Sequence, residues 1–344
     1  MTNQKLKIQV SPSDGLAVTK ALPLELSEDK VMVKVSHVGI CGSDLHYAID
    51  RRNGDYLIEE PLTLGHEISG TIVQIGSRAA CELPVGAKVV VHPSPVCPPA
   101  GATISSGENL LVEGGYLGSA STSPHLQGGL TDELAVYPHQ LRAIPDSLDL
   151  RRAALAEPLA VALHGVSLAG TIEGKSVLVM GAGPVGLLTV LAAKHKGAEF
   201  VTATDFYDHA LTKATHMGAD RVVNIGATSL NGLADIVIEA SGAPAAAAQA
   251  LSSVKKGGTV VQLGILPTGD ISLPYAEIIS KEVIIKGSWR FDVELDEAIS
   301  VLASHHEAEA VISHVLPIRE GLKGFSLAAE PELSSKVLIS VSGL

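Results

Sequence analysis

The pattern of apolar and polar residues changes near residue 150. Before this point the chain carries short segments in which apolar side chains occupy every second position, and Pro and Gly punctuate the connections. Alternation with a period of two is typical of a strand that buries one face. Such strands are expected at residues 31–37, 70–75 and 88–92. The pattern predicts a partly open β-barrel or a sandwich.

Beyond about residue 153, apolar strands alternate with helical segments. Strands are expected at residues 176–180, 200–204, 235–240, 259–263 and 283–286, and helices at 183–196, 208–217 and 243–250. Strands built almost wholly of Val, Ile and Leu and separated by helices indicate a parallel sheet covered on both faces. A helix at 295–304 and a strand at 335–341 are expected to rejoin the first domain. The predicted domains are 1–152, 153–290 and a C-terminal return at 291–344.

The composition is that of an acidic globular protein. Of 344 residues, 46% are hydrophobic and 18% are charged, which excludes a disordered chain. The net charge of −12 argues against binding nucleic acids or anionic membranes through bulk charge. The apolar stretch 177–193 contains three glycines and a proline, so we expect a strand, a turn and a helix rather than a membrane span. Three cysteines and the lack of an apolar signal segment in residues 1–10 favour a cytoplasmic location.

A glycine-rich turn follows the strand expected at 176–180. Gly181, Gly183 and Gly186 have the spacing of a dinucleotide-binding turn, and Pro184 and Val185 lie between the last two. The first glycine permits a tight turn, the second lets the backbone approach a pyrophosphate, and the third lets helix and strand pack closely. The helix N-terminus would then present free N–H groups to phosphate. The simpler alternative is an ordinary turn between a strand and a helix.

Asp205 ends the next expected strand, about twenty residues further on. A carboxylate at this position accepts hydrogen bonds from the ribose hydroxyls and repels a 2′-phosphate. The segment between Asp205 and Lys213 contains no Arg that could offset this repulsion. The sequence therefore predicts NAD rather than NADP.

Cys41, His66 and Glu67 offer a thiolate, an imidazole and a carboxylate. This mixed set suits Zn²⁺, and it is typical of a site that keeps one position open for substrate. Glu157 is a candidate fourth or exchanging ligand. Each residue also has a simpler interpretation, such as a small buried thiol, a surface hydrogen bond, or a carboxylate that complements a helix dipole. An open zinc site and a dinucleotide site on one chain together point to alcohol oxidation.

Five segments carry a wider resemblance. They are Gly39-Ile40-Cys41-Gly42-Ser43-Asp44-Leu45-His46-Tyr47, Leu64-Gly65-His66-Glu67, Ala156-Glu157-Pro158-Leu159-Ala160, the turn from Gly181 to Gly186, and Gly287-Ser288-Trp289-Arg290-Phe291. The chain resembles, from about residue 30 to its C-terminus, the zinc-dependent medium-chain dehydrogenases of the sorbitol dehydrogenase branch. The resemblance implies a GroES-like catalytic domain, a Rossmann cofactor domain and an aldonate or polyol substrate.

The resemblance also implies a role for each residue around the metal. Cys41, His66 and Glu67 would hold one catalytic zinc, and Glu157 would lie close enough to ligate it in some states. Ser43 would take the proton of the substrate hydroxyl and pass it to the cofactor ribose and to His46. Ser43 as a helix N-cap and His46 as a surface residue are the simpler alternatives.

Further roles follow for substrate and cofactor. Tyr47 and Arg290 would contact the substrate, although Tyr47 could instead be core packing and Arg290 a structural ion-pair partner. Cofactor contacts are also expected at Ser241, Gly264 and Ser288. The family forms homodimers and homotetramers, partly by pairing the last strand of the cofactor sheet, which is expected here at 283–286.

The chain departs from the family in one lobe. Relatives often hold a second, structural zinc near residues 90–125 with four closely spaced Cys, whereas Cys97 is the one Cys of this stretch. One thiolate cannot build a closed four-coordinate site, so no structural zinc is expected. The remaining alternatives are a sorbitol- or xylitol-type dehydrogenase, a threonine-type dehydrogenase, and a zinc-free cofactor-binding protein. A zinc-free quinone reductase would lack the ligand set that this chain has.

Overall fold

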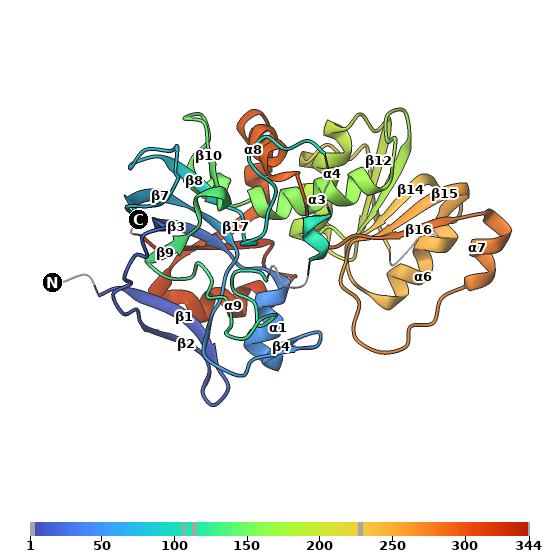
Figure 1. Ribbon diagram of the computed structural model, residues 1–344. Helices are drawn as coiled ribbons and strands as arrows, with labels where there is room; N and C mark the ends of the chain where they lie inside the picture. The colour runs from blue at the N-terminus through green and yellow to red at the C-terminus, as the bar shows by residue number, and fades with distance from the viewer. Residues whose placement is uncertain (1–3, 105–106, 112–114, 226–229, 343–344) are drawn as a thin grey trace. The chain divides into compact units, whose positions relative to one another are not determined.

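The computed structural model describes residues 4–104, 107–111, 115–225 and 230–342. The chain forms two compact units. The first comprises Met1–Glu157, Leu295–Ser304 and Ile312–Leu344, and the second comprises Pro158–Glu294 and His305–Val311 (Figure 1). In the described part of the chain, no helix is both long and apolar enough to cross a membrane.

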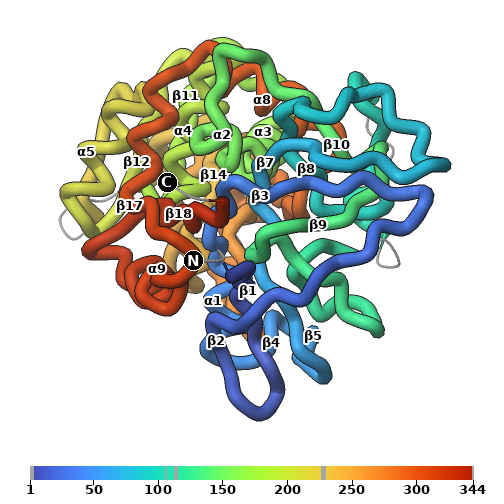
Figure 2. Tube along the Cα trace, turned by 90° about the vertical axis from the view of Figure 1, so that its left-hand side faces the viewer, coloured from blue at the N-terminus to red at the C-terminus, as the bar shows by residue number. Residues whose placement is uncertain are grey.

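A seven-stranded sheet forms the centre of the first unit. Its strands follow the path β10-β8-β7-β3-β18-β17, and β9 also pairs with β3. Their bounds are β3 (Val31–Gly39), β7 (Glu67–Ile75), β8 (Lys88–Val91), β9 (Glu133–Val136), β10 (Leu141–Ala143), β17 (Ile312–Pro317) and β18 (Lys336–Ser340). Figure 2 shows β18, near the C-terminus, beside β3, with which it pairs antiparallel. The end of the chain thus completes the sheet of the first unit.

The remaining elements of the first unit surround this sheet. They are a three-stranded sheet of β1 (Leu6–Ser11), β2 (Gly15–Lys20) and β6 (Leu62–Thr63), the short pair β4 (Arg52–Asn53) and β5 (Tyr56–Leu57), and the helices α1 (Gly42–Asp50), α2 (Leu150–Ala153), α8 (Leu295–Ser304) and α9 (Gly321–Ala328). Val31, Val33 and Val35 of β3 are wholly buried in an aliphatic core. The strand expected at 31–37 is confirmed, but Met32 is also buried, so the alternation is not strict.

The second unit is a parallel sheet with the strand order β13-β12-β11-β14-β15-β16. The strands are β11 (Ser176–Met180), β12 (Phe200–Asp205), β13 (Arg221–Asn224), β14 (Ala234–Glu239), β15 (Val254–Gln262) and β16 (Ile284–Gly287). The helices are α3 (Ala156–Leu168), which begins at the end of the first unit, α4 (Pro184–His195), α5 (Asp208–His216), α6 (Pro244–Ser253) and α7 (Tyr275–Lys281). This order is that of a doubly wound dinucleotide-binding fold, as expected.

Two elements of this unit were not expected from the sequence. Strand β13 is short, and two of its four residues are exposed. Helix α7 is seven residues long, and none of them is fully buried. Helix α6 packs on β14 and β15 (Figure 1) and coincides with the Ala-rich segment expected to be helical. Ligands of such sheets bind at the carboxyl ends of the strands where the winding reverses, which here lies between β11 and β14.

Candidate active site

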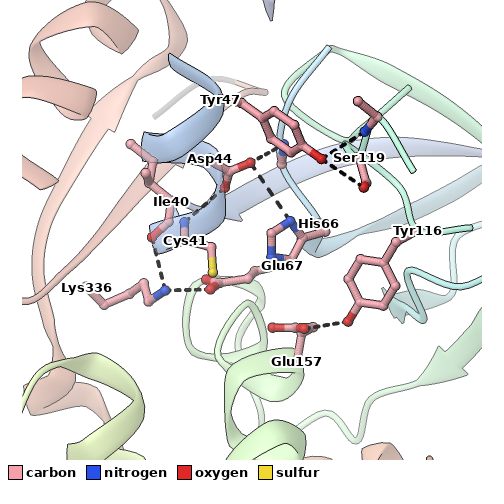
Figure 3. A network of polar contacts seen from close by, with 12 residues as sticks. Ile40, Cys41, Asp44, Tyr47, His66, Glu67, Tyr116, Ser119, Glu157 and Lys336 are labelled. Atoms are coloured by element: carbon pink, nitrogen blue, oxygen red, sulfur yellow. Dashed lines mark hydrogen bonds and ion pairs between the residues drawn. The ribbon is translucent and has the colours of Figure 1, made fainter. Parts of the chain in front are cut away.

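Strand register brings the predicted metal ligands together. Gly39 at the end of β3 pairs with Glu67 at the start of β7, so Cys41, two residues beyond Gly39, arrives beside His66 and Glu67. One ligand atom from each of these three side chains lies within 4.8 Å of the other two. Figure 3 shows the three side chains converging on one point. The structure therefore gathers the predicted triplet in one place.

Glu67 forms a buried ion pair with Lys336. A Cβ atom on Gly39 would collide with the carboxylate of Glu67, so glycine is required for this close approach. Oε1 of Glu67 lies 2.5 Å from Nζ of Lys336, which also donates to the carbonyl of Ile40 at 3.1 Å. The side chains of Lys336 and Glu67 are 2% and 1% exposed. Burial lowers the pKa of Lys336, but the negative charges of Glu67 and Cys41 raise it by more than burial lowers it. The ammonium form is therefore favoured.

Asp44 fixes the loop that carries Cys41. Helix α1 begins after Cys41, and one oxygen of Asp44, in the first turn, accepts the backbone N–H of Cys41 at 2.9 Å. The other oxygen accepts the N–H of Gly65 at 3.1 Å and lies 3.9 Å from Nδ1 of His66. Asp44 is wholly buried, and burial raises its pKa. This carboxylate thus links the two segments that carry the predicted metal ligands.

The charges around the triplet favour a cation. Burial lowers the pKa of His66, but Asp44 and Cys41 outweigh it and raise the pKa to about 10. Oε2 of Glu67 is buried and has no hydrogen-bond partner among the described residues. A divalent cation would coordinate this oxygen. It would also supply the positive charge that protonation of His66 otherwise provides. Sulfur, nitrogen and oxygen donors in one small group fit zinc.

Glu157 lies next to this group without belonging to it. It is the second residue of α3, and its Oε1 accepts a hydrogen bond from the Tyr116 hydroxyl at 2.7 Å. The ring of Tyr116 also contacts the ring of His66 edge-on, with centroids 5.5 Å apart (Figure 3). Burial raises the pKa of Glu157, and the charge on His66 acts in the opposite direction. Tyr116 therefore holds Glu157 in position beside the candidate ligands.

The three other predicted residues of this region lie on α1. Ser43 is half-buried in the first turn. His46 is exposed, and its Nδ1 lies 3.3 Å from the carboxylate of Asp50 one turn later. Tyr47 is 1% exposed, and its hydroxyl accepts the N–H of Ala120 at 3.0 Å and contacts Ser119 Oγ at 3.1 Å. Burial and these two contacts favour the packing interpretation of Tyr47 over direct substrate contact.

The glycine-rich turn of the second unit has the geometry that its spacing predicts. Gly181 has a φ of +94°, and Gly183 is the N-cap of α4, with Pro184 at the first helical position. A Cβ atom on Gly186 would collide with the carbonyl of Gly181. Asp205 ends β12 and accepts the N–H of Ala182 at 2.7 Å. The strand end and the turn are thus fixed to each other.

The other predicted cofactor residues lie just beyond β14, β15 and β16. The wholly buried carboxylate of Glu239 accepts the N–H of Ser241 at 2.7 Å. Gly264 leaves no room for a side chain because a Cβ atom there would collide with Gly242. The N–H of Ser288 donates to the carbonyl of Gln262 at 2.9 Å. These residues, like Gly181, therefore lie at the carboxyl ends of the strands of this sheet.

A buried arginine holds the lobe around Cys97. Arg142 is 4% exposed and donates to the carbonyls of Pro98 at 2.5 Å and His139 at 2.6 Å. Its Nε lies 3.3 Å from the carboxylate of Asp296. Burial raises the pKa of Cys97 to about 11. Guanidinium contacts link the segments of this lobe.

Four residues of these sites were missed by the sequence reasoning. Asp44 carried a usable signal, because an acidic residue three positions after a helix N-cap completes a capping box. Lys336 carried a weaker one, as a charged residue that precedes the apolar run from Val337 to Ile339 in a wholly buried strand. Tyr116 and Arg142 carried none, since their partners lie 41 and 154 residues away in Glu157 and Asp296.

One unit of this chain gathers a mixed-ligand metal site, and the other has a dinucleotide-binding fold; together they define a metal-dependent dehydrogenase. Residues 27–146 match the alcohol dehydrogenase GroES-like domain, and residues 184–304 match the zinc-binding dehydrogenase family. The chain belongs to the zinc-dependent medium-chain dehydrogenases, in the sorbitol dehydrogenase branch. Zinc and NAD(P) fit its two sites.

Named relatives and a solved structure agree with this assignment. L-idonate 5-dehydrogenase (NAD(P)(+)) of Escherichia coli strain K12 is 34% identical over 301 residues, which cover 86% of each chain. Sorbitol dehydrogenase of Bacillus subtilis strain 168 is 34% identical over 312 residues, which cover 88% of this chain and 87% of the relative. The crystal structure of the Escherichia coli L-idonate 5-dehydrogenase superposes with a TM-score of 0.88 at 30% identity and covers 99% of both chains. The family is therefore that of the polyol and sugar-acid dehydrogenases.

Proposed function

We propose that this protein oxidises a secondary alcohol of a sugar acid or polyol by hydride transfer to NAD, with the conversion of L-idonate to 5-keto-D-gluconate as the first candidate. The observation that carries this proposal is the triplet of Cys41, His66 and Glu67, whose ligand atoms lie within 4.8 Å of one another. Similarity to the Escherichia coli L-idonate 5-dehydrogenase supports L-idonate as the first candidate substrate. A sorbitol- or xylitol-type activity is the second candidate, because sorbitol dehydrogenases match at the same identity.

Each residue of the first unit would have a distinct task. Cys41, His66 and Glu67 would hold one zinc, and Glu157 would ligate it in some states. When bound, the zinc polarises and acidifies a substrate hydroxyl, and the nicotinamide accepts a hydride. Oγ of Ser43 would take the hydroxyl proton. His46 would then pass it toward water, which its exposure allows.

The second unit would bind NAD along the carboxyl ends of its strands. The backbone from Gly181 to Gly186 would approach the pyrophosphate, with Pro184 and Val185 opening the helix behind it. Asp205 would accept the ribose hydroxyls, since each of its oxygens has a lone pair beyond the one used by a backbone N–H. Ser241, Gly264 and Ser288 would complete the site.

Arg290 would recognise the carboxylate of a sugar acid. A guanidinium binds a carboxylate with two parallel hydrogen bonds, which would offset the repulsion of an anion by a chain of net charge −12. Loss of one charge-assisted contact costs about 1.5–3 kcal/mol, or roughly one to two decades in kcat/KM. Arg290→Ala should therefore impair L-idonate oxidation by this amount and impair a neutral polyol of similar length much less.

The test is NAD reduction with L-idonate, D-gluconate, sorbitol, xylitol and threonine, for the native enzyme, Arg290→Ala and the control Arg52→Ala. Arg52 is exposed and is held by the carbonyl of Gly54, so its loss should change no ratio between substrates. Equal losses of activity on the sugar acid and the polyol in Arg290→Ala would contradict the carboxylate role of Arg290. Good activity on sorbitol or xylitol with none on L-idonate would establish the second candidate instead.

We also propose that the enzyme is a cytoplasmic homodimer or homotetramer. Strand β16 is the edge of the sheet in the second unit, and all four of its residues are exposed. Ile284 and Ile285 are 52% and 45% exposed. An unpaired edge strand that exposes apolar side chains is prone to pair with another chain. Light scattering after size-exclusion chromatography should give two or four chain masses, and cell fractionation should find the protein in the cytoplasm. A monomer or a membrane-bound fraction would contradict these proposals.

A further inference from the structure

The segment that carries Arg290 has an unusual backbone. In the described part of the chain, three non-glycine residues have a positive φ, namely Arg51, Glu282 and Arg290. Arg51 and Glu282 end helices α1 and α7, where a left-handed residue is common. Arg290 ends no helix, and its φ is +55°. Such a conformation costs free energy and persists where the surrounding structure imposes it.

A buried pair lies directly after this residue. Oε1 of Glu294 lies 2.9 Å from Nδ1 of His164, and Oε2 of Glu294 accepts the N–H of Asp292 at 2.9 Å. A carboxylate only accepts hydrogen bonds, so Nδ1 of His164 carries the proton and donates. His164 and Glu294 are 8% and 7% exposed, and Phe291 is 2% exposed. The carboxylate of Glu294 therefore bonds to the backbone two residues earlier and also to helix α3.

Helix α3 holds the segment from both sides. Before the segment, Nζ of Lys286 donates to the carbonyl of Leu168, the last residue of α3, at 2.8 Å. After it, Glu294 bonds to His164, which lies one helical turn before Leu168. Residues four apart occupy the same face of a helix. The seven residues between Lys286 and Glu294 are thus fixed at both ends to the last turns of α3.

We propose that His164 and Glu294 are positioning residues that hold Arg290 in its left-handed conformation for the substrate carboxylate. The proposal rests on the carboxylate role of Arg290 given above, and it adds that acid specificity depends on a buried pair that touches no substrate. Breaking the pair should release the segment, allow Arg290 to relax to negative φ, and remove the preference for an acid.

The single tryptophan of the chain reports on this segment without any substrate. Trp289 precedes Arg290, is 41% exposed, and its ring centroid lies 5.3 Å from the guanidinium carbon. His164→Leu removes the donor to Glu294 at similar volume, whereas His164→Asn keeps an N–H near the position of Nδ1. We expect His164→Leu to shift the Trp289 emission to the red and to increase acrylamide quenching. His164→Asn should keep the native spectrum.

Kinetics provide the second measurement. His164→Leu should raise KM for L-idonate about tenfold, the loss of one hydrogen-bonded contact, with little change for a polyol. In an Arg290→Ala background the same substitution should add nothing, because it acts through Arg290. The control is Asp220→Asn, which removes the charge that pairs with Lys194 elsewhere in the second unit. It should leave both the spectrum and the substrate ratio unchanged.

The outcomes separate this proposal from the function on which it rests. If Arg290→Ala affects all substrates equally, the carboxylate role fails, and the Trp289 spectrum of His164→Leu still decides whether the pair positions the segment. An unchanged spectrum, or equal losses on acid and polyol in His164→Leu, would overturn the positioning role. Should His164→Leu not fold, Glu294→Met breaks the same pair from its other side and is assessed by the same two measurements.

Discussion

Replacing Lys336 by Met tests the charge balance of the metal site. The ammonium of Lys336 lies 2.5 Å from Glu67, and the two side chains are 2% and 1% exposed. Methionine has a similar length and no charge, so the substitution leaves little cavity. It removes the ion pair with Glu67 and the hydrogen bond to the carbonyl of Ile40. In the zinc-free protein, Glu67 then remains as a buried carboxylate without its cation.

The expected loss of stability is large. Breaking a buried ion pair by removing one partner costs about 3–5 kcal/mol, because the remaining charge is buried without compensation. The exposed pair of Lys5 and Glu133 provides a matched control, since Lys5 is 45% exposed. Lys5→Met should cost about 0–1 kcal/mol. Lys336→Met combined with Glu67→Gln should recover most of the loss, because removing both charges is often nearly neutral.

Denaturant unfolding of the zinc-free protein, followed by far-UV circular dichroism, measures these differences. Trp289 lies in the second unit and Lys336 in the first, so Trp289 fluorescence monitors the unit that does not carry the substitution. Added zinc should then stabilise Lys336→Met more than the native protein, because the cation binds an uncompensated carboxylate. A loss as small as that of Lys5→Met, or no recovery in the double variant, would refute the view that Glu67 is an ionised carboxylate balanced by Lys336.

Two further substitutions test the cofactor site and the lobe around Cys97. Asp205→Asn keeps an acceptor at the end of β12 but removes the charge, so the ratio of kcat/KM with NAD to that with NADP should fall; a native preference for NADP would contradict this role. Arg142→Met removes two short hydrogen bonds to carbonyls and should lower the free energy of unfolding by about 3 kcal/mol, measured by denaturant unfolding. Elemental analysis should give one zinc per chain before and after this change, and two tightly bound zincs would refute the expected absence of a structural site.

Short-range patterns account for the parts of the site that could be predicted. The turn from Gly181 to Gly186 needs a positive φ at its start and close packing at its end, and both requirements select glycine. Asp205 follows from the same unit, because the acidic position of this fold is set by the length of one strand–helix–strand segment. Period-two alternation marked β3, whose register with β7 then brings Cys41 to Glu67.

Side-chain environment was harder to predict than position. Tyr47 lies in the second turn of α1, and the family resemblance implied that it contacts the substrate. In the structure its hydroxyl is bound to Ala120 and Ser119, which lie more than 70 residues away. A sequence motif places a residue on an element, but the face it presents depends on loops that the motif does not contain. The substrate contact of Tyr47 therefore stays a prediction.

Buried cations show where sequence reasoning reaches its limit. A charged residue within a strand that is buried on both faces must have a partner, because an unpaired buried charge is too costly to retain. Lys336 opens such a strand, so its sequence context already implies a carboxylate nearby. It does not say which carboxylate, since Glu67 lies 269 residues away and meets Lys336 only because β18 and β7 both pair with β3. The need for a partner is a property of the residue, whereas the choice of partner is a property of the topology. In this chain that choice places the cation next to Glu67, a predicted zinc ligand, which makes a structural pair part of the candidate active site.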